Sequence, residues 1–135
     1  KNIKLLYFKI LSISIYLRLC LNNIINIYFK QMVKLEHTIK DLITFYIKEN
    51  YNKYLKDNNL TQIDNDKIYD VISELYDNKK THIKEFLKSS LKELLKDEYP
   101  GDLVVNNICF EIFQDDNLCK NRVYNEIKLH QEKNL

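Results

Sequence analysis

The sequence predicts an all-α protein: a small bundle of four to five helices, with an additional apolar and basic N-terminal segment that is expected to be helical. Apolar residues recur at three- and four-residue steps through most of residues 34–130, which is the spacing of helices that bury one face. Apolar types make up 45% of the 135 residues, with ten Tyr and six Phe among them, which is enough for one core. The chain has one Gly and one Pro, and they are adjacent, so strong breaks are rare.

The first helix of the bundle is expected over residues 34–56. Glu36 precedes Lys40 by four residues, a pairing that stabilises an exposed helix face by roughly 0.2–0.5 kcal/mol. The turn-forming residues at 57–59 are expected to end this helix. Its apolar positions are Leu35, Ile39, Leu42, Ile43, Tyr46, Ile47, Tyr54 and Leu55.

The next helix is expected to begin at Asp64, whose carboxylate is suited to cap free backbone amides. Residues 78–81 leave two alternatives open. Either they break the helix and Thr81 caps a third one, or one long helix runs from about residue 67 to residue 97. The apolar positions are Ile68, Val71, Ile72, Leu75 and Tyr76, followed by Ile83, Phe86, Leu87, Leu91, Leu94 and Leu95.

The pair Pro100-Gly101 predicts a connection, because Pro does not continue a helix and Gly accepts the backbone that ends one. Asp102 is then placed to cap a short helix over residues 102–113, although the β-branched residues there leave a strand as the alternative. A last helix is expected to start at residues 115–117 and to fray after residue 130. The inward positions expected in the two segments are Leu103, Val104, Ile108, Ile112 and Phe113, and then Leu118, Val123, Ile127 and His130.

The N-terminal segment, residues 1–31, differs in composition from residues 32–135, which we expect to form a single helical domain. The segment carries five cations and no carboxylate, whereas the remainder carries 16 cations and 19 carboxylates. Four interpretations are open: an artefact of upstream sequence, a membrane anchor, a targeting segment such as a mitochondrial presequence, or a helix that belongs to the core. Lys9 and Arg18 weigh against the anchor, since a cation near the centre of a spanning helix costs about 2.5–3.5 kcal/mol.

Composition also bears on partners and on the compartment. Residues 32–135 have a net negative charge and a single arginine, Arg122, so nucleic-acid binding is unlikely to be the function. The three cysteines, Cys20, Cys109 and Cys119, are an odd number, which favours a reducing intracellular compartment over a disulfide scaffold. We expect a cytoplasmic protein, with a membrane-associated or mitochondrial location as the alternative. The bias toward Lys, Leu, Ile, Asn, Tyr and Phe is what an AT-rich genome produces.

No motif predicts a catalytic residue, a cofactor-binding residue or a metal ligand, and we expect no cofactor. The loop over residues 57–68 fails as an EF-hand, because Gln62 stands where the turn needs Gly and Ile68 where a bidentate Glu is needed. The histidines do not lie at zinc-ligand spacings from one another or from the cysteines. These histidines are His37, His82 and His130.

The function predicted from the sequence is that of a non-catalytic intracellular helical interaction subunit or adaptor. It would bind a protein partner or a second copy of itself, since a nearly neutral helical chain without a catalytic motif usually works by presenting a surface. The tyrosines are of a type enriched at binding surfaces: Tyr46, Tyr51, Tyr54, Tyr69, Tyr76, Tyr99 and Tyr124. The alternative is a membrane-anchored or organelle-targeted helical protein that uses residues 1–31. A third hypothesis, a thiol enzyme, depends only on the presence of Cys109 and Cys119.

Overall fold

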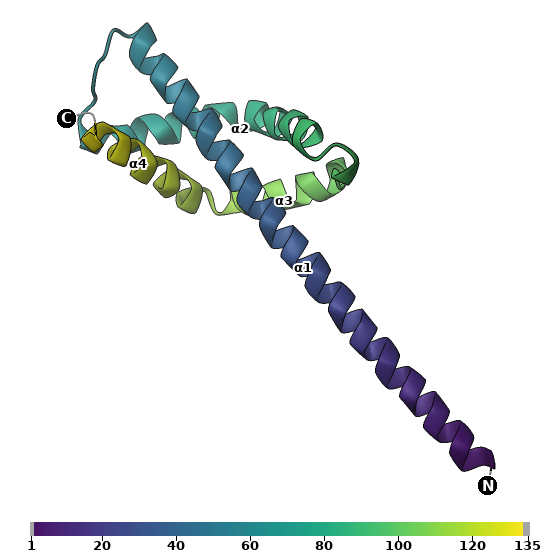
Figure 1. Ribbon diagram of the computed structural model, residues 1–135. Coiled ribbons are helices and arrows are strands. Elements are labelled where there is room, and N and C mark those ends of the chain that lie inside the picture. Colours follow the sequence, from purple (N-terminus) through teal and green to yellow (C-terminus); the bar gives the residue numbers. More distant parts are fainter. Residues whose placement is uncertain (1, 134–135) are drawn as a thin grey trace. The chain divides into compact units, whose positions relative to one another are not determined.

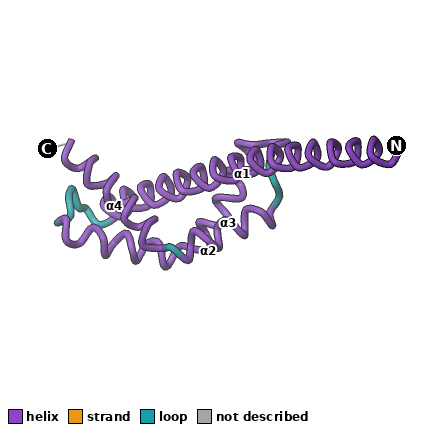
Figure 2. Tube along the Cα trace, turned by 90° about the horizontal axis from the view of Figure 1, so that it is seen from below, coloured by secondary structure: helices purple, strands orange, loops and turns teal. Residues whose placement is uncertain are grey.

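The computed structural model describes residues 2–133, except for the side chains of residues 2, 28 and 29, and this part of the chain is all-α (Figures 1 and 2). No strand occurs within it, so the predicted fold class, a small all-α bundle, is confirmed. The chain divides into two compact units, one ending at His37 and the other beginning at Thr38. The helices are α1 (Asn2–Asp57), α2 (Asn65–Leu95), the short 3-10 helix η1 (Lys96–Glu98), α3 (Asp102–Gln114) and α4 (Asp116–Lys133).

The second unit is a helical bundle with its own core. The part of α1 after residue 37 contacts α2 through Tyr46 and α4 through Lys48. α3 and α4 follow one another along α2 in the opposite direction. This direction follows from the contacts, since Tyr69 of α2 meets Tyr124 of α4, and Tyr76 meets Phe113 of α3. The side chains that are nearly inaccessible are Ile39, Ile43, Ile47, Tyr51, Ile68, Ile72, Tyr76, Ile83, Leu87, Leu91, Val105, Ile108, Cys109, Ile112, Cys119, Val123 and Ile127.

Residues 78–81 do not break the second helix. The long-helix alternative was the right one, and Thr81 lies inside α2 rather than at a cap. Asp64 is the N-cap residue of α2 as predicted, but its carboxylate makes no capping hydrogen bond; its backbone carbonyl instead accepts from the amides of Lys67 and Ile68.

The segment after Pro100 is a helix and not a strand. The N-cap of α3 is Gly101, with φ of 105° and ψ of 158°, so Asp102 is the first helical residue rather than the cap. This backbone conformation is nearly restricted to glycine, which explains why the single Gly of the chain lies here. The Asp102 carboxylate accepts a hydrogen bond of 2.6 Å from the Tyr99 hydroxyl.

Some inward positions were predicted wrongly. Leu94, Leu103 and Leu118 are 62%, 80% and 59% exposed, and His130 is exposed as well. In α4 the buried face carries Cys119, Val123 and Ile127. The helix restarts at Asp116 after a break, so its core-facing phase is set by packing against α2, which apolar spacing alone does not reveal.

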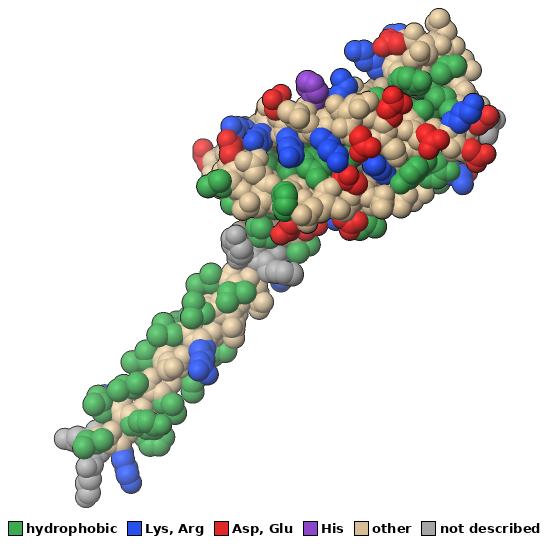
Figure 3. All heavy atoms as spheres, turned by 180° about the vertical axis from the view of Figure 1, so that it is seen from behind, with side chains coloured by type: hydrophobic (Ala, Val, Ile, Leu, Met, Phe, Trp, Pro, Cys, Tyr) green, Lys and Arg blue, Asp and Glu red, His purple; other side chains and the backbone are tan. Residues whose placement is uncertain are grey.

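The first unit consists of the part of α1 up to His37. Between Ile3 and Ile27, sixteen large apolar side chains are exposed, from 44% for Leu11 to 81% for Ile3. Figure 3 shows apolar side chains along the visible face of this segment. The helix is long and apolar enough to cross a membrane by length and composition.

Candidate functional site

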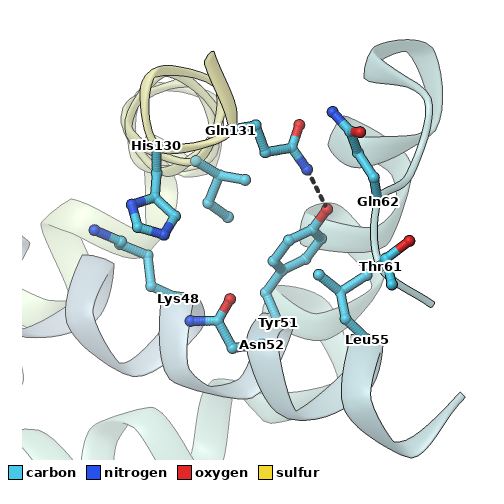
Figure 4. A pocket seen from close by; sticks show the side chains of 9 residues that line it. Lys48, Tyr51, Asn52, Leu55, Thr61, Gln62, His130 and Gln131 are labelled. Atoms are coloured by element: carbon cyan, nitrogen blue, oxygen red, sulfur yellow. Dashed lines mark hydrogen bonds between the residues drawn. The ribbon is translucent and has the colours of Figure 1, made fainter. Parts of the chain in front are cut away.

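A pocket of about 450 Å³ lies in the bundle where α1 ends and α4 ends (Figure 4). α1 contributes Lys48, Tyr51, Asn52 and Leu55; the loop before α2 contributes Thr61 and Gln62; and α4 contributes Ile127, His130 and Gln131. These nine side chains offer amides, hydroxyls, one imidazole and one ammonium, but no carboxylate and no thiol. His130 was considered from the sequence as a metal ligand, but the pocket was not predicted. Its lining comes from three segments that are far apart in the sequence, so no spacing pattern marks it.

Tyr51 closes the inner side of the pocket. The ring is buried, and its hydroxyl accepts a 3.3 Å hydrogen bond from Nε2 of Gln131. Burial, the larger effect, raises the pKa of Tyr51, and the Gln131 hydrogen bond partly opposes this. Nζ of Lys48 lies 3.6 Å from Oε2 of Glu126, and this carboxylate partly neutralises the charge of the ammonium group. The pocket therefore offers hydrogen bonds to a small polar molecule, but it lacks the paired carboxylates used for general acid–base chemistry.

A second polar cluster joins α2 to α4. Nζ of Lys80 lies 2.9 Å from Oδ2 of Asp116 and 3.9 Å from Oδ1 of Asp77. Nζ of Lys120 lies 3.4 Å from the same Asp77 oxygen. Both ammonium groups are also near the Tyr76 ring, at 5.6 and 5.7 Å from its centroid. The two cations and two carboxylates balance one another, which is the pattern of a structural network that connects two helices.

Tyr76 carries an unusual hydroxyl within this cluster. Its side chain is fully buried, and neither its hydroxyl nor Oδ1 of Asp116 has a hydrogen-bond partner among the described residues. Burial is the main cause of a strong rise in the pKa of Tyr76, and the neighbouring Cys119 and Asp116 add to it. Tyr76 therefore stays a neutral phenol throughout the ordinary pH range.

The two later cysteines are free and buried in the bundle. Burial, the largest effect, raises the pKa of Cys109 and of Cys119, although Lys84 near the first and Lys40 near the second partly oppose it. A thiol enzyme needs the reverse, a depressed pKa and an accessible sulfur. The geometry thus gives the thiol-enzyme hypothesis no support.

The histidines and carboxylates do not form a cluster that would hold a metal ion, within the part of the chain that the structure describes. His82 is exposed on α2, far along the sequence from His130 in the pocket lining. The loop tested as an EF-hand connects α1 to α2, with Thr61 and Gln62 in the pocket wall.

The tyrosines singled out from the sequence lie largely in the packing of the bundle. Tyr51 and Tyr76 are fully buried; Tyr46 packs on Phe86 with ring centroids 5.1 Å apart; and Tyr69 packs on Tyr124 at 6.2 Å. Exposed aromatic surface in the bundle is provided by Tyr54, which is 38% exposed, and by two phenylalanines. Phe45 is 52% exposed on α1, and Phe110 is 60% exposed on α3.

Two large apolar side chains of α3 are directed to solvent, with the exposed Asn106 and Asn107 between them on the same side of the helix. Leu103, 80% exposed, and Phe110 are seven residues apart, which places them two turns apart on the same side of the helix. Elsewhere on the bundle, cations and carboxylates are intermixed over the face visible in Figure 3.

Comparison with protein-family models, with curated proteins and with solved structures finds no match to this chain.

Proposed function

We propose that the protein is a membrane-anchored helical interaction subunit, in which residues 3–27 form a bilayer helix and the bundle binds a protein partner. The exposure of the sixteen apolar side chains of the first unit supports the anchor. Side chains of this kind on all sides of a helix need an apolar environment, and a bilayer provides one. Of the two functions expected from the sequence, the membrane-anchored alternative thus receives the stronger support.

The length and the polar residues of the segment are compatible with a spanning helix. Its 25 residues extend about 37 Å, slightly more than the roughly 30 Å of hydrocarbon in a bilayer. Lys4, Asn23 and Asn26 lie toward the two ends, where headgroups and water are within reach. Arg18 lies near the centre and costs about 2.5–3.5 kcal/mol, whereas each Leu or Ile there contributes about 0.3–0.6 kcal/mol in favour of insertion. Ten Leu and Ile residues between positions 10 and 27 offset the cost of Arg18, and Lys9, six residues from the centre, is within reach of the headgroups through its long side chain.

Membrane fractionation tests the anchor. The native protein is expected to sediment with membranes and to resist extraction with alkaline carbonate, and terminal peptides should show that residues 1–31 are part of it. Replacing Ile15 and Leu19 by Asp should release the protein, since two buried carboxylates oppose insertion. The matched variant, with Ile15→Leu and Leu19→Ile, should stay in the membrane. A native protein that is fully soluble, or that lacks peptides from residues 1–31, would overturn the anchor.

The interaction part of the proposal is supported by two exposed apolar side chains of α3. Leu103 and Phe110 gain nothing from exposure to water, and such surface residues often mark contacts with other proteins. Replacing both by Ser should abolish co-purification of a stoichiometric partner while the thermal midpoint of the bundle stays within a few degrees. Ser replacements of Leu94 and Leu129, which are 62% and 57% exposed on α2 and α4, are the matched control. A native protein that purifies without any stoichiometric partner would contradict this part.

A further inference from the structure

One face of the first unit carries an uninterrupted apolar seam. When residues 3–27 are arranged in heptads, the positions that begin each heptad are Ile3, Ile10, Leu17 and Ile24. The fourth positions are Leu6, Ile13, Cys20 and Ile27. All eight are apolar and lie within one regular helix, so they form a continuous stripe along it.

No other row of this heptad is free of polar residues. Among residues 3–27, each of the five remaining rows contains at least one Lys, Arg, Ser or Asn. These polar residues are Lys4 and Arg18 in one row, Ser12 and Asn26 in another, Lys9 and Asn23 in a third, and Ser14 and Asn22 in the last two. The apolar bias of the segment is general, but the separation of polar groups from one face is specific to the seam.

The seam is unpartnered within its unit. Its seven aliphatic side chains are between 55% and 81% exposed. A large apolar side chain carries roughly 60–120 Å² of surface that can be buried, the area that corresponds to about 1.5–3 kcal/mol at about 25 cal/mol per Å². Within a bilayer this surface already contacts lipid, so pairing is favoured by closer side-chain packing and not by removal from water. Two copies facing each other would together bury about 800–1,600 Å², which overlaps the 1,200–2,000 Å² or so of stable protein interfaces.

We propose that the protein self-associates through this seam, with a second copy of the chain as the partner, in a parallel left-handed coiled coil. A seven-residue apolar repeat imposes that handedness on packed helices. The parallel orientation rests on the proposed anchor, because helices inserted with the same topology point the same way. The segment has no carboxylate that would attract a basic partner helix, and its seam matches an identical seam.

Cys20 makes the proposal testable without adding a probe. In a parallel pair, the fourth positions of the heptads face each other, so Cys20 lies opposite Cys20 of the second copy, at a separation that permits a disulfide. Cys109 and Cys119 are buried and do not compete. Mild oxidation of the full-length protein in detergent micelles with diamide, which takes up the two electrons and two protons of the thiols, should give a covalent dimer. Cys20→Ser should abolish it.

Matched cysteine scanning identifies the face. In the Cys20→Ser background, Ile13→Cys and Leu17→Cys lie on the seam, whereas Ile15→Cys and Leu19→Cys change the same residue types outside it. The seam variants should cross-link at least about tenfold faster than the others. Equal rates at all four positions would overturn the proposal. So would a mixture in which Cys20 of the wild-type chain cross-links only to a chain with Ile10→Cys and Cys20→Ser, since these positions face each other in an antiparallel pair.

Sedimentation in density-matched detergent provides a second measurement. Ile13→Ala with Leu17→Ala should weaken association by more than about tenfold, since several buried methylene groups are lost from each copy. Ile15→Ala with Leu19→Ala should change it by less than about twofold. A wild-type chain that is monomeric in micelles yet carbonate-resistant in membranes would overturn the seam and leave the anchor intact. A soluble chain that still cross-links at Cys20 would overturn the anchor alone.

Discussion

At the scale of single residues, Tyr76 offers the clearest test of the core. Its hydroxyl is buried without a hydrogen-bond partner among the described residues, and such a group costs about 1–3 kcal/mol. Tyr76→Phe keeps the ring, so the free energy of unfolding should stay unchanged or rise by about 1 kcal/mol in urea denaturation. Tyr51→Phe, which removes the acceptor for Gln131, should instead cost about 0.5–1.5 kcal/mol. A larger loss for Tyr76→Phe than for Tyr51→Phe would show that a bound water or ligand satisfies the Tyr76 hydroxyl.

The same tyrosine predicts a dependence on alkaline pH. The pKa of Tyr76 in the folded protein lies above the ordinary value of 10.0, mainly because of burial. Folding therefore favours the neutral phenol. The contribution of the neutral Tyr76 phenol to the free energy of unfolding is complete below about pH 10. It is lost as the pH rises further, because the phenol of the unfolded chain ionises first. From about pH 8 to pH 11, the wild-type protein should therefore lose stability relative to the Tyr76→Phe variant, as measured by their free energies of unfolding. A difference that is constant with pH would contradict the direction of the pKa shift.

Gly101 tests backbone conformation in isolation from packing. A Cβ atom at this position would meet nothing within 4 Å, yet φ is 105°. Gly101→Ala should therefore cost about 1–3 kcal/mol of unfolding free energy through backbone strain alone. The control is Asn106→Ala, at an exposed site in the regular part of α3, which should change stability by less than about 0.5 kcal/mol. Equal effects of the two changes in chemical denaturation would exclude strain at Gly101.

At the scale of elements, apolar periodicity predicted where helices form better than where they end or which side they bury. The steps of three and four residues through Ile39, Ile43 and Ile47 gave the buried face of α1 correctly. Periodicity does not show whether polar residues break a helix, and residues 78–81 lie in the middle of α2. Leu118 is exposed because the break before α4 resets the helical phase, so that Cys119 faces the core instead.

Two leucines of α2 convert this distinction into a measurement. Leu87 and Leu94 are seven residues apart in the same helix and were predicted to share one buried face, but Leu87 is inaccessible and Leu94 is 62% exposed. Leu87→Ala should cost about 2–5 kcal/mol, the loss typical of a buried large-to-small change. Leu94→Ala should cost less than about 0.5 kcal/mol. Comparable losses in urea denaturation would mean that Leu94 is covered by a part of the protein or by a second copy.

The candidate sites show a different limit of sequence analysis. The pocket gathers Tyr51, Thr61 and Gln131 from three elements, and no pair of its residues has a spacing that marks a site. Only the packing of α1 against α4 brings them together. The α2–α4 cluster has the same character, since Asp77 and Lys120 are paired by packing. A local helical repeat is visible in one segment, whereas a site made by packing requires the tertiary structure.

At the scale of the whole molecule, the core and the proposed anchor belong to different units. Every nearly inaccessible apolar side chain in the described part lies between Ile39 and Ile127, and therefore in the second unit. The apolar side chains of residues 3–27 are exposed and belong to the first unit. The stability of the bundle should thus be independent of the N-terminal segment, and solubility should depend on it.

A fragment covering residues 32–135 tests this separation directly. It should be soluble without detergent, show the helical circular dichroism of a folded bundle, and melt within about 3 °C of the full-length protein, because it keeps every nearly inaccessible side chain of the core. The full-length chain should need detergent or lipid to stay in solution, since its exposed apolar segment associates in water. Cutting within the bundle, between η1 and α3, should instead abolish cooperative melting, because the core of α2 loses Val105, Ile108 and Ile112. A fragment 32–135 that is unfolded would show that the first unit completes the bundle, and the anchor would then have to give way to a structural role for those residues.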